Sequence, residues 1–287
     1  MRIAVASGKG GTGKTTIATS LALSLVVNGE VHYVDCDVEA PNGHIFLKPQ
    51  ITHQSNAVIR IPVINKDTCS LCGRCVEVCQ FHALAKIGKM IMTFPQLCHG
   101  CGSCTVNCPE NAIEELANPI GVIESGVTAH GLNFSQGRLN ISEPMSTPVI
   151  RQLKKSITTK DEPIVVLDAP PGASCSVVET LRGVDFVLLV AEPTPFGVHD
   201  LKQMIGIVTE MGIPAGVIIN REKAMFMPLK DLCTEVHIPI LMNIPFDRRI
   251  AAGLAEGLTL IEINPDYSQR LQDVYRQISS IIASIKE

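Results

Sequence analysis

The sequence has no tryptophan, and aromatic residues make up only 4% of its 287 residues, whereas 46% are hydrophobic. This scarcity disfavours an aromatic surface that stacks on single-stranded nucleic acid. No basic run is present and the formal net charge is −4, which also disfavours a protein that binds the phosphate backbone of nucleic acid. An interior of Ile, Val, Leu and Ala is instead typical of a parallel sheet between helices.

Long apolar runs are also missing. No segment approaches about 18 consecutive apolar residues, so we expect no transmembrane helix. The apolar run Arg2–Ser7 is too short for the core of a signal peptide and predicts a buried strand. Eleven cysteines without a secretion signal indicate a reducing compartment and metal binding, so we expect a cytoplasmic protein.

The order of the predicted elements indicates an α/β protein. A strand at Arg2–Ser7 is followed by a glycine-rich loop, a helix at Lys14–Val27 and a strand at Val31–Asp35. The same alternation resumes later, with strands expected at Ile164–Asp168, Phe186–Ala191, Gly216–Asn220 and Ile240–Ile244. We therefore predict a doubly wound, mostly parallel sheet.

Two further segments show a clear pattern of apolar residues. Residues Gly121–Ser142 alternate apolar and polar side chains, which predicts a β-hairpin leading back to the sheet. The segment Asp266–Glu287 predicts a helix whose apolar face consists of Leu271, Val274, Tyr275, Ile278, Ile281, Ile282 and Ile285. Its few basic residues are offset by acidic ones, so we expect this face to pack on the core rather than on a membrane surface.

A phosphate-binding motif follows the first strand. The motif G-x-x-x-x-G-K-[ST] is matched by Gly8, Lys9, Gly10, Gly11, Thr12, Gly13, Lys14 and Thr15. Backbone amides of such a loop surround the phosphates of ATP, Lys14 reaches the β- and γ-phosphates, and Thr15 offers its hydroxyl to Mg²⁺. Asp168, at the end of a predicted strand, is the expected acid beside the metal ion.

Two aspartates flank Cys36 at the end of the second strand. We expect either Asp35 or Asp37 to hold or polarise the attacking water. The competing interpretation is that they cap a helix or stabilise a turn.

The middle of the chain, roughly 60–117, contains two copies of the spacing C-x₂-C-x₂-C-x₃-C. The copies are Cys69, Cys72, Cys75 and Cys79, and then Cys98, Cys101, Cys104 and Cys108, offset by 98 − 69 = 29 residues. Zinc would leave half of these thiolates unused, so the pattern favours two [4Fe–4S] clusters. The nearby His82 and His99 are expected at the surface or next to the ligands rather than as ligands. Cys175 and Cys233 stand alone and are expected to be buried.

This double motif resembles the bacterial two-cluster ferredoxins, and the resemblance implies a small inserted α+β module. In that family the last cysteine of each run serves the other cluster. The implied ligand sets are Cys69, Cys72, Cys75 and Cys108 for one cluster, and Cys98, Cys101, Cys104 and Cys79 for the other. The predicted division is 1–59 and 118–287 for the ATPase domain, with the module at 60–117.

The phosphate-binding loop carries an early second lysine, Lys9, in a segment that runs to Thr16. It resembles the deviant Walker A motif of the MinD, ParA and nitrogenase-iron-protein superfamily. The resemblance implies that Lys9 reaches the nucleotide of a dimer partner and that Asp37 serves the hydrolytic water. It also implies that Asp168 is the Walker B acid. The pair Asn220 and Arg221 resembles the segment of that family that contacts adenine.

From these features we expect a Mg²⁺-dependent ATPase, stimulated by a partner, that forms an ATP-dependent homodimer. The nucleotide state of the dimer would gate electron transfer or cluster traffic to an unidentified redox or client protein. One alternative is an ATP-dependent factor that assembles metal clusters, and another is a positioning ATPase similar to MinD. No nucleic acid partner is expected.

Overall fold

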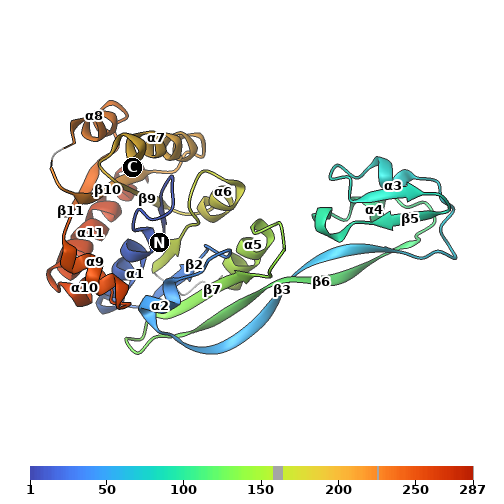
Figure 1. Ribbon diagram of the computed structural model, residues 1–287, viewed down its shortest axis with the longest axis horizontal. Helices are drawn as coiled ribbons and strands as arrows, with labels where there is room; N and C mark the ends of the chain where they lie inside the picture. Colours follow the sequence, from blue (N-terminus) through green and yellow to red (C-terminus); the bar gives the residue numbers. More distant parts are fainter. Residues whose placement is uncertain (158–163, 225, 287) are drawn as a thin grey trace.

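The protein is described by a computed structural model that covers residues 1–157, 164–224 and 226–286. A nine-stranded sheet forms the body, in the order β11-β10-β9-β1-β8-β2-β7-β6-β3. The strands from β11 to β7 pair in parallel, whereas β7 with β6 and β6 with β3 pair antiparallel. Figure 1 shows the sheet with helices on both faces and a small lobe held away from the body.

The strands of the main sheet are β1 (Arg2–Ala6), β2 (Val31–Asp35), β3 (Gln50–Ile64), β6 (Ile113–Val127), β7 (Asn133–Leu139), β8 (Ile164–Asp168), β9 (Phe186–Ala191), β10 (Ala215–Glu222) and β11 (Ile240–Pro245). The helices of the body are α1 (Lys14–Leu25), η1 (Val26–Asn28), α2 (Gly43–Leu47), α5 (Thr147–Ser156), α6 (Cys175–Leu181), α7 (Pro195–Glu210), α8 (Met227–Glu235), α9 (Arg248–Ala255), α10 (Leu260–Ile263) and α11 (Asp266–Lys286).

Alternation along the buried strands divides the core into two layers. On β1, Ile3 and Val5 pack with α1 and α11, whereas Ala4 and Ala6 face the layer that contains α5 to α8. Successive side chains of a strand point to opposite faces, so a strand that is apolar throughout needs a helical layer on each side. The predicted doubly wound, mostly parallel sheet is therefore confirmed.

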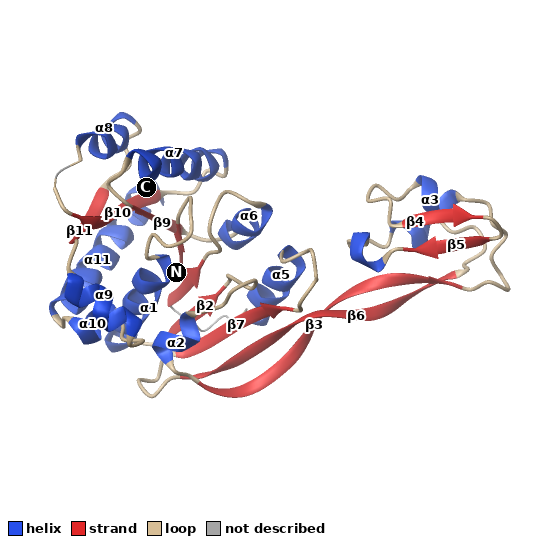
Figure 2. Ribbon diagram, viewed as in Figure 1, coloured by secondary structure: helices blue, strands red, loops and turns tan. Residues whose placement is uncertain are grey.

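A long two-stranded ribbon carries the small lobe. The strands β3 and β6 extend together from the edge of the sheet (Figure 2). At the far end of the ribbon, the last residue of β3, Ile64, pairs with the first residue of β6, Ile113. The lobe between them contains α3 (Arg74–Glu77), β4 (Leu84–Ile87), β5 (Met90–Thr93), η2 (Pro95–Leu97) and α4 (Ser103–Val106). The division expected at residues 60 and 117 falls inside the two ribbon strands, because they extend from the body into the lobe without a break.

Most predicted elements lie where the sequence pattern placed them. The strands expected at Val31–Asp35, Ile164–Asp168 and Phe186–Ala191 are found with the same bounds, and β6 and β7 form the expected hairpin. On α11, Leu271, Val274 and Ile278 are buried in the core, as predicted. Ile285 was wrongly assigned to that buried face: its side chain is 62% exposed, because the last turn of the helix extends past the core.

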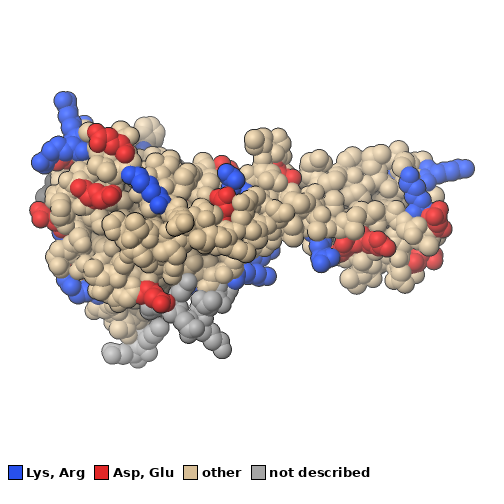
Figure 3. Space-filling view, turned by 90° about the horizontal axis from the view of Figure 1, so that it is seen from below, with Lys and Arg blue, Asp and Glu red and all other residues tan. Residues whose placement is uncertain are grey.

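The charged side chains follow the sequence-based expectation. On the face shown in Figure 3, Lys and Arg are scattered and lie among Asp and Glu. Within the residues that the structure covers, no helix is both long enough and apolar enough to cross a bilayer.

Candidate functional site

The glycine-rich loop lies between the carboxyl end of β1 and the start of α1, near the middle of the sheet. Gly11 and Gly13 have φ angles of 79° and 95°, in the left-handed region that side chains rarely adopt. A Cβ at Gly8 would lie 2.5 Å from the backbone oxygen of Asp200, so the loop packs against α7. The loop turns its backbone toward the start of α1, which is the arrangement that binds phosphate.

Lys14 opens α1 inside a cluster of carboxylates. Its side chain is buried, and burial lowers the pKa of its ammonium group, while Asp168, Asp37 and Asp35 raise it. Asp168 ends β8, Asp35 ends β2, and Asp37 lies two residues further along the chain. The sequence motif thus places its lysine beside the three predicted aspartates.

Asp168 and Asp35 are paired residues on the neighbouring strands β8 and β2, and both are fully buried. Burial raises the pKa of each carboxyl group, and their mutual repulsion raises the pKa of Asp35 further. Tyr33 donates a hydrogen bond to Oδ2 of Asp168 at 3.0 Å. Within the described residues Oδ1 of Asp168 has no hydrogen-bond partner, and the Thr15 hydroxyl and Lys14 lower the pKa of the group. An unpartnered carboxylate oxygen beside a hydroxyl group fits a Mg²⁺ ion.

The two aspartates that flank Cys36 have different surroundings. Asp35 accepts hydrogen bonds from the backbone N–H groups of Asp37, Asn42 and Gly43 at 3.1, 3.0 and 2.9 Å. It therefore shapes the loop after β2, in agreement with the turn-stabilising interpretation. Asp37 is partly exposed and lines an open cavity. Burial raises the pKa of Asp37, and Lys14 lowers it.

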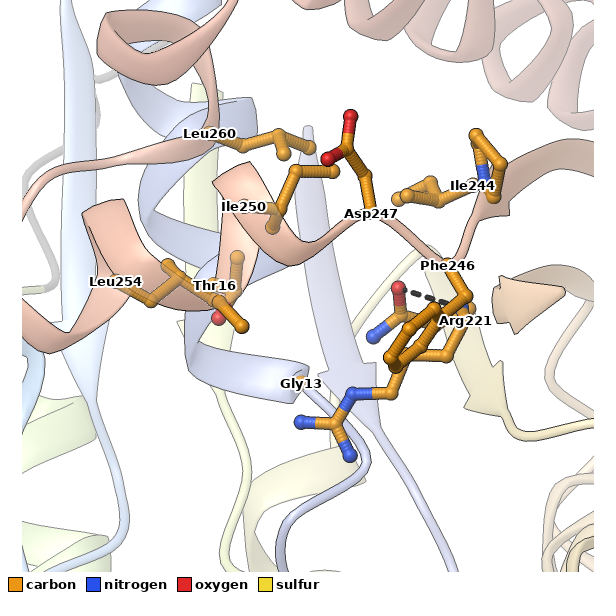
Figure 4. A pocket seen from close by; sticks show the side chains of 12 residues that line it. Gly13, Thr16, Arg221, Ile244, Phe246, Asp247, Ile250, Leu254 and Leu260 are labelled. Atoms are coloured by element: carbon orange, nitrogen blue, oxygen red, sulfur yellow. Dashed lines mark hydrogen bonds between the residues drawn. The ribbon is translucent and has the colours of Figure 1, made fainter. Parts of the chain in front are cut away.

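A second pocket lies beside Gly13 and Thr16, at the start of α1. Figure 4 shows Arg221 and Phe246 along one side of it and Ile250 and Leu254 of α9 along the other. The loop from Ile244 to Asp247 completes the wall. No sequence motif marks this segment. Its place could still be expected, because a strand was predicted at Ile240–Ile244 and ligands of such sheets bind at the carboxyl ends of strands.

Asn220 lies at the junction of this pocket and the phosphate-binding loop. Its side-chain amide donates a hydrogen bond to the backbone oxygen of Thr12 at 2.7 Å, and its Oδ1 accepts one from the N–H of Arg221 at 3.0 Å. A Cβ at Gly13 would collide with this amide. Both polar ends of Asn220 are thus engaged by the protein, and Asn220, Arg221 and Phe246 all line the pocket.

Lys9 is only partly exposed, because it lies against another loop of the same chain. Its Nζ lies 3.2 Å from Oε2 of Glu192, the residue that directly follows β9. The other oxygen of Glu192 accepts a hydrogen bond of 2.6 Å from Arg221. One carboxylate therefore joins the phosphate-binding loop to the rim of the second pocket, a contact that no sequence motif indicated.

The small lobe has two cavities, and four cysteines line each of them. One small cavity is lined by Cys69, Cys72, Cys75 and Cys108. The other is lined by Cys79, Cys98, Cys101 and Cys104. Each set combines three cysteines of one run with the last cysteine of the other.

The backbone repeats with the offset of 29 residues that the sequence predicts. Gly73 and Gly102 precede the one-turn helices α3 and α4 with φ angles of 86° and 75°. The last cysteine of each run accepts a backbone hydrogen bond at 3.3 Å, Cys79 from Ala83 and Cys108 from Ala112. The eleven cysteines, all of which lie within the described residues, form no disulfide. In the described part of the chain, no three His, Cys, Asp or Glu side chains converge on a single metal position.

A wide cleft of about 1520 Å³ of open space separates the lobe from the body. Asp37 and Cys175 line it from the body, and His99 lines it from the lobe. His99 stacks on Phe81, with ring centroids 3.7 Å apart, and also lines the second cysteine cavity. The expectation that Cys175 is buried is wrong, because this residue begins α6 at the wall of the cleft. Cys233 is buried as expected.

Comparison with known proteins identifies the class of the body. The CobQ/CobB/MinD/ParA nucleotide-binding domain matches residues 3–261. The chain therefore belongs to this family of P-loop nucleotide-binding proteins. A solved structure of the septum site-determining protein MinD with Mg-ADP, from Pyrococcus horikoshii, matches with a TM-score of 0.59 at 18% identity. The match covers 100% of this chain and 98% of that one, and shows that the two share a fold.

The chain is also similar to several proteins over nearly its whole length. Two uncharacterized proteins of Methanocaldococcus jannaschii are each 30% identical to this chain; the matches cover 92% and 98% of it, and 93% and 98% of the relatives. A protein of Aedes aegypti named as a cytosolic Fe-S cluster assembly factor, a Nubp2 homolog, is 24% identical over 97% of this chain and 96% of its own length. The chain is thus similar along nearly its whole length to proteins with and without a described role.

Proposed function

We propose that the chain is a Mg²⁺-dependent ATPase that carries two [4Fe–4S] clusters, and that its nucleotide state gates electron transfer or cluster traffic to a partner protein. The observation that carries this proposal is that Asp37 of the body and His99 of the lobe line the same cleft. His99 also borders the second cysteine cavity, so one side chain adjoins both proposed sites. A change of the loop around Asp37 would therefore alter a wall of the cleft that His99 also lines.

The residues at the phosphate-binding loop suit ATP hydrolysis. Lys14 would neutralise charge on the transferred phosphoryl group, and Thr15 and Asp168 would hold the Mg²⁺ ion. Asp37 would orient the attacking water, because both carboxylate oxygens of Asp35 already accept hydrogen bonds from backbone N–H groups. The pocket beside Arg221 and Phe246 would take the base. The burial of Lys14 among these aspartates beside the glycine loop supports these assignments.

The cysteine cavities suit cuboidal clusters. Four cysteine side chains line each cavity, and iron–sulfur clusters are bound by four thiolates. Backbone N–H groups directed at cysteine sulfur, as from Ala83 and Ala112, tune the potential of such clusters. We therefore interpret residues 60–117 as a ferredoxin-like module.

Iron analysis of anaerobically purified protein tests the cluster assignment. We expect about eight iron and about eight sulfide per chain, with the brown colour of such clusters. About one or two zinc ions per chain without a chromophore would refute it. The Lys14→Ala variant should keep its iron and lose ATP hydrolysis. ATP turnover in that variant equal to the parent rate would refute the assigned phosphate site.

A second candidate function is supported by the similarity to the Aedes aegypti assembly factor. In this case the chain would use ATP to load clusters into a client protein. Incubation of the iron-loaded protein with an apo-ferredoxin distinguishes the two candidates. ATP-dependent transfer of iron and sulfide to the acceptor would favour assembly, whereas retained clusters that exchange electrons would favour gating.

A further inference from the structure

Glu192 joins two cations that belong to different parts of the nucleotide site. Its Oε1 accepts a hydrogen bond of 2.6 Å from Arg221, and its Oε2 lies 3.2 Å from the ammonium group of Lys9. The side chain of Glu192 is only 15% exposed, against 36% for Lys9 and 50% for Arg221. The carboxylate is thus the inner member of the three, and the two cations reach it from outside.

The backbone of Glu192 is held in a tight turn at the end of β9. Its carbonyl oxygen accepts a hydrogen bond from the N–H of Thr194 at 2.8 Å, and Thr194 caps α7 by accepting one from Gly197 at 3.0 Å. A Cβ at Gly197 would collide with the carbonyl of Glu192. The carboxylate is therefore fixed in place, whereas Lys9 lies on a loop and has a long, flexible side chain.

The geometry points to Glu192 as a positioning residue that holds Lys9 on its own subunit until ATP-dependent dimerisation releases it. This inference rests on the proposed function, in which Lys9 contacts the nucleotide of the partner subunit. A carboxylate and a triphosphate compete for the same ammonium group. Because Arg221 stays bound to Glu192, the release of Lys9 leaves no unpaired charge behind on this subunit.

The energy of the ion pair between Lys9 and Glu192 can be bounded from the exposure of the two side chains. A partly exposed ion pair contributes about 0.2–1 kcal/mol, and each dimer would break two such pairs. The restraint therefore raises the dissociation constant of the dimer by roughly two- to thirtyfold. Glu192 would thus keep the protein monomeric at low ATP without preventing assembly when both nucleotide sites are filled.

The Glu192→Gln variant tests this inference, because glutamine keeps an oxygen for Arg221 and removes the charge that holds Lys9. The matched control is Glu222→Gln, since Glu222 accepts a hydrogen bond from Asn243 at 2.8 Å and is not among the residues paired with Lys9. Both changes are made in an Asp37→Ala protein that binds ATP without turnover. Light scattering with Mg-ATP under anaerobic conditions then gives the dimer dissociation constant of each protein.

We expect Glu192→Gln to lower the dissociation constant of the dimer by roughly two- to thirtyfold and Glu222→Gln to leave it unchanged. In a protein that also carries Lys9→Ala, in which the dimer is suppressed, Glu192→Gln should not restore it. A weaker or unaltered dimer in Glu192→Gln would overturn the inference, as would a gain that persists without Lys9. If the Asp37→Ala parent itself forms no dimer with ATP, the cross-subunit role of Lys9 fails, and this inference fails with it.

Discussion

Asn220 offers a sharp test of how the nucleotide site is built, because its amide supports the phosphate-binding loop. The Asn220→Ala variant removes the donor to the buried carbonyl of Thr12 and the acceptor for the N–H of Arg221. A buried polar group left without its partner costs about 1–3 kcal/mol. If this cost falls on the phosphate-binding conformation, the affinity for ATP drops by about five- to 150-fold.

The loss should not depend on the base, because the damaged element binds phosphate. Calorimetric titration should therefore give the same loss for ATP, GTP and inorganic triphosphate. Ile250→Ala provides the contrast, since this side chain lines the base pocket away from the loop. That variant should lower the affinity for ATP and leave the affinity for inorganic triphosphate unaltered. If Asn220→Ala weakened ATP alone, Asn220 would contact the base, as the family resemblance implies, and the role as a loop support would be refuted.

Three further predictions concern the other parts of the site. Cys79→Ser should remove the cluster held by the second cysteine run, because Cys79 lines that cavity; loss of the first run's spectrum instead would contradict the crossed ligand sets. Burial raises the pKa of Asp35 and Asp168, so the folded protein binds these protons more tightly than the unfolded chain and loses stability as pH rises. The urea midpoint of the nucleotide-free protein should therefore fall as the pH rises from about 4 to about 8, and Asp168→Asn should reduce the part of that fall that lies below about pH 6; an equal fall in both proteins would refute the assignment. Lys9→Ala should keep the clusters but suppress the ATP-dependent dimer of an Asp37→Ala protein, and equal dimer fractions would exclude the cross-subunit role.

The parallel sheet could be predicted from the sequence because its strands are short, apolar and separated by helical segments. The same is true of the glycine loop, whose motif encodes a backbone conformation as well as a set of side chains. The offset of 29 residues also predicted that the lobe has two equivalent halves. Gly73 and Gly102, and then Cys79 and Cys108, have matching backbone geometry or hydrogen bonds.

Other features depend on contacts between distant segments, and local patterns do not encode them. The ion pair between Lys9 and Glu192 joins residues far apart in the sequence, and the pocket loop after β11 has no motif of its own. The engagement of both polar ends of Asn220 depends on the position of Thr12. The long ribbon that carries the lobe was missed because β3 begins with exposed polar residues that hide its alternation.

The central claim is that nucleotide state and cluster state are coupled across the cleft between Asp37 and His99. Redox-poised electron paramagnetic resonance of the anaerobic protein, with and without Mg-ATP, measures this coupling directly. The Lys14→Ala variant is the control for effects of ATP that do not pass through the phosphate site. We predict that ATP shifts the midpoint potential or the line shape of the cluster beside His99 in the parent and leaves this variant unaltered. Identical spectra and potentials with and without ATP in the parent protein would contradict the account.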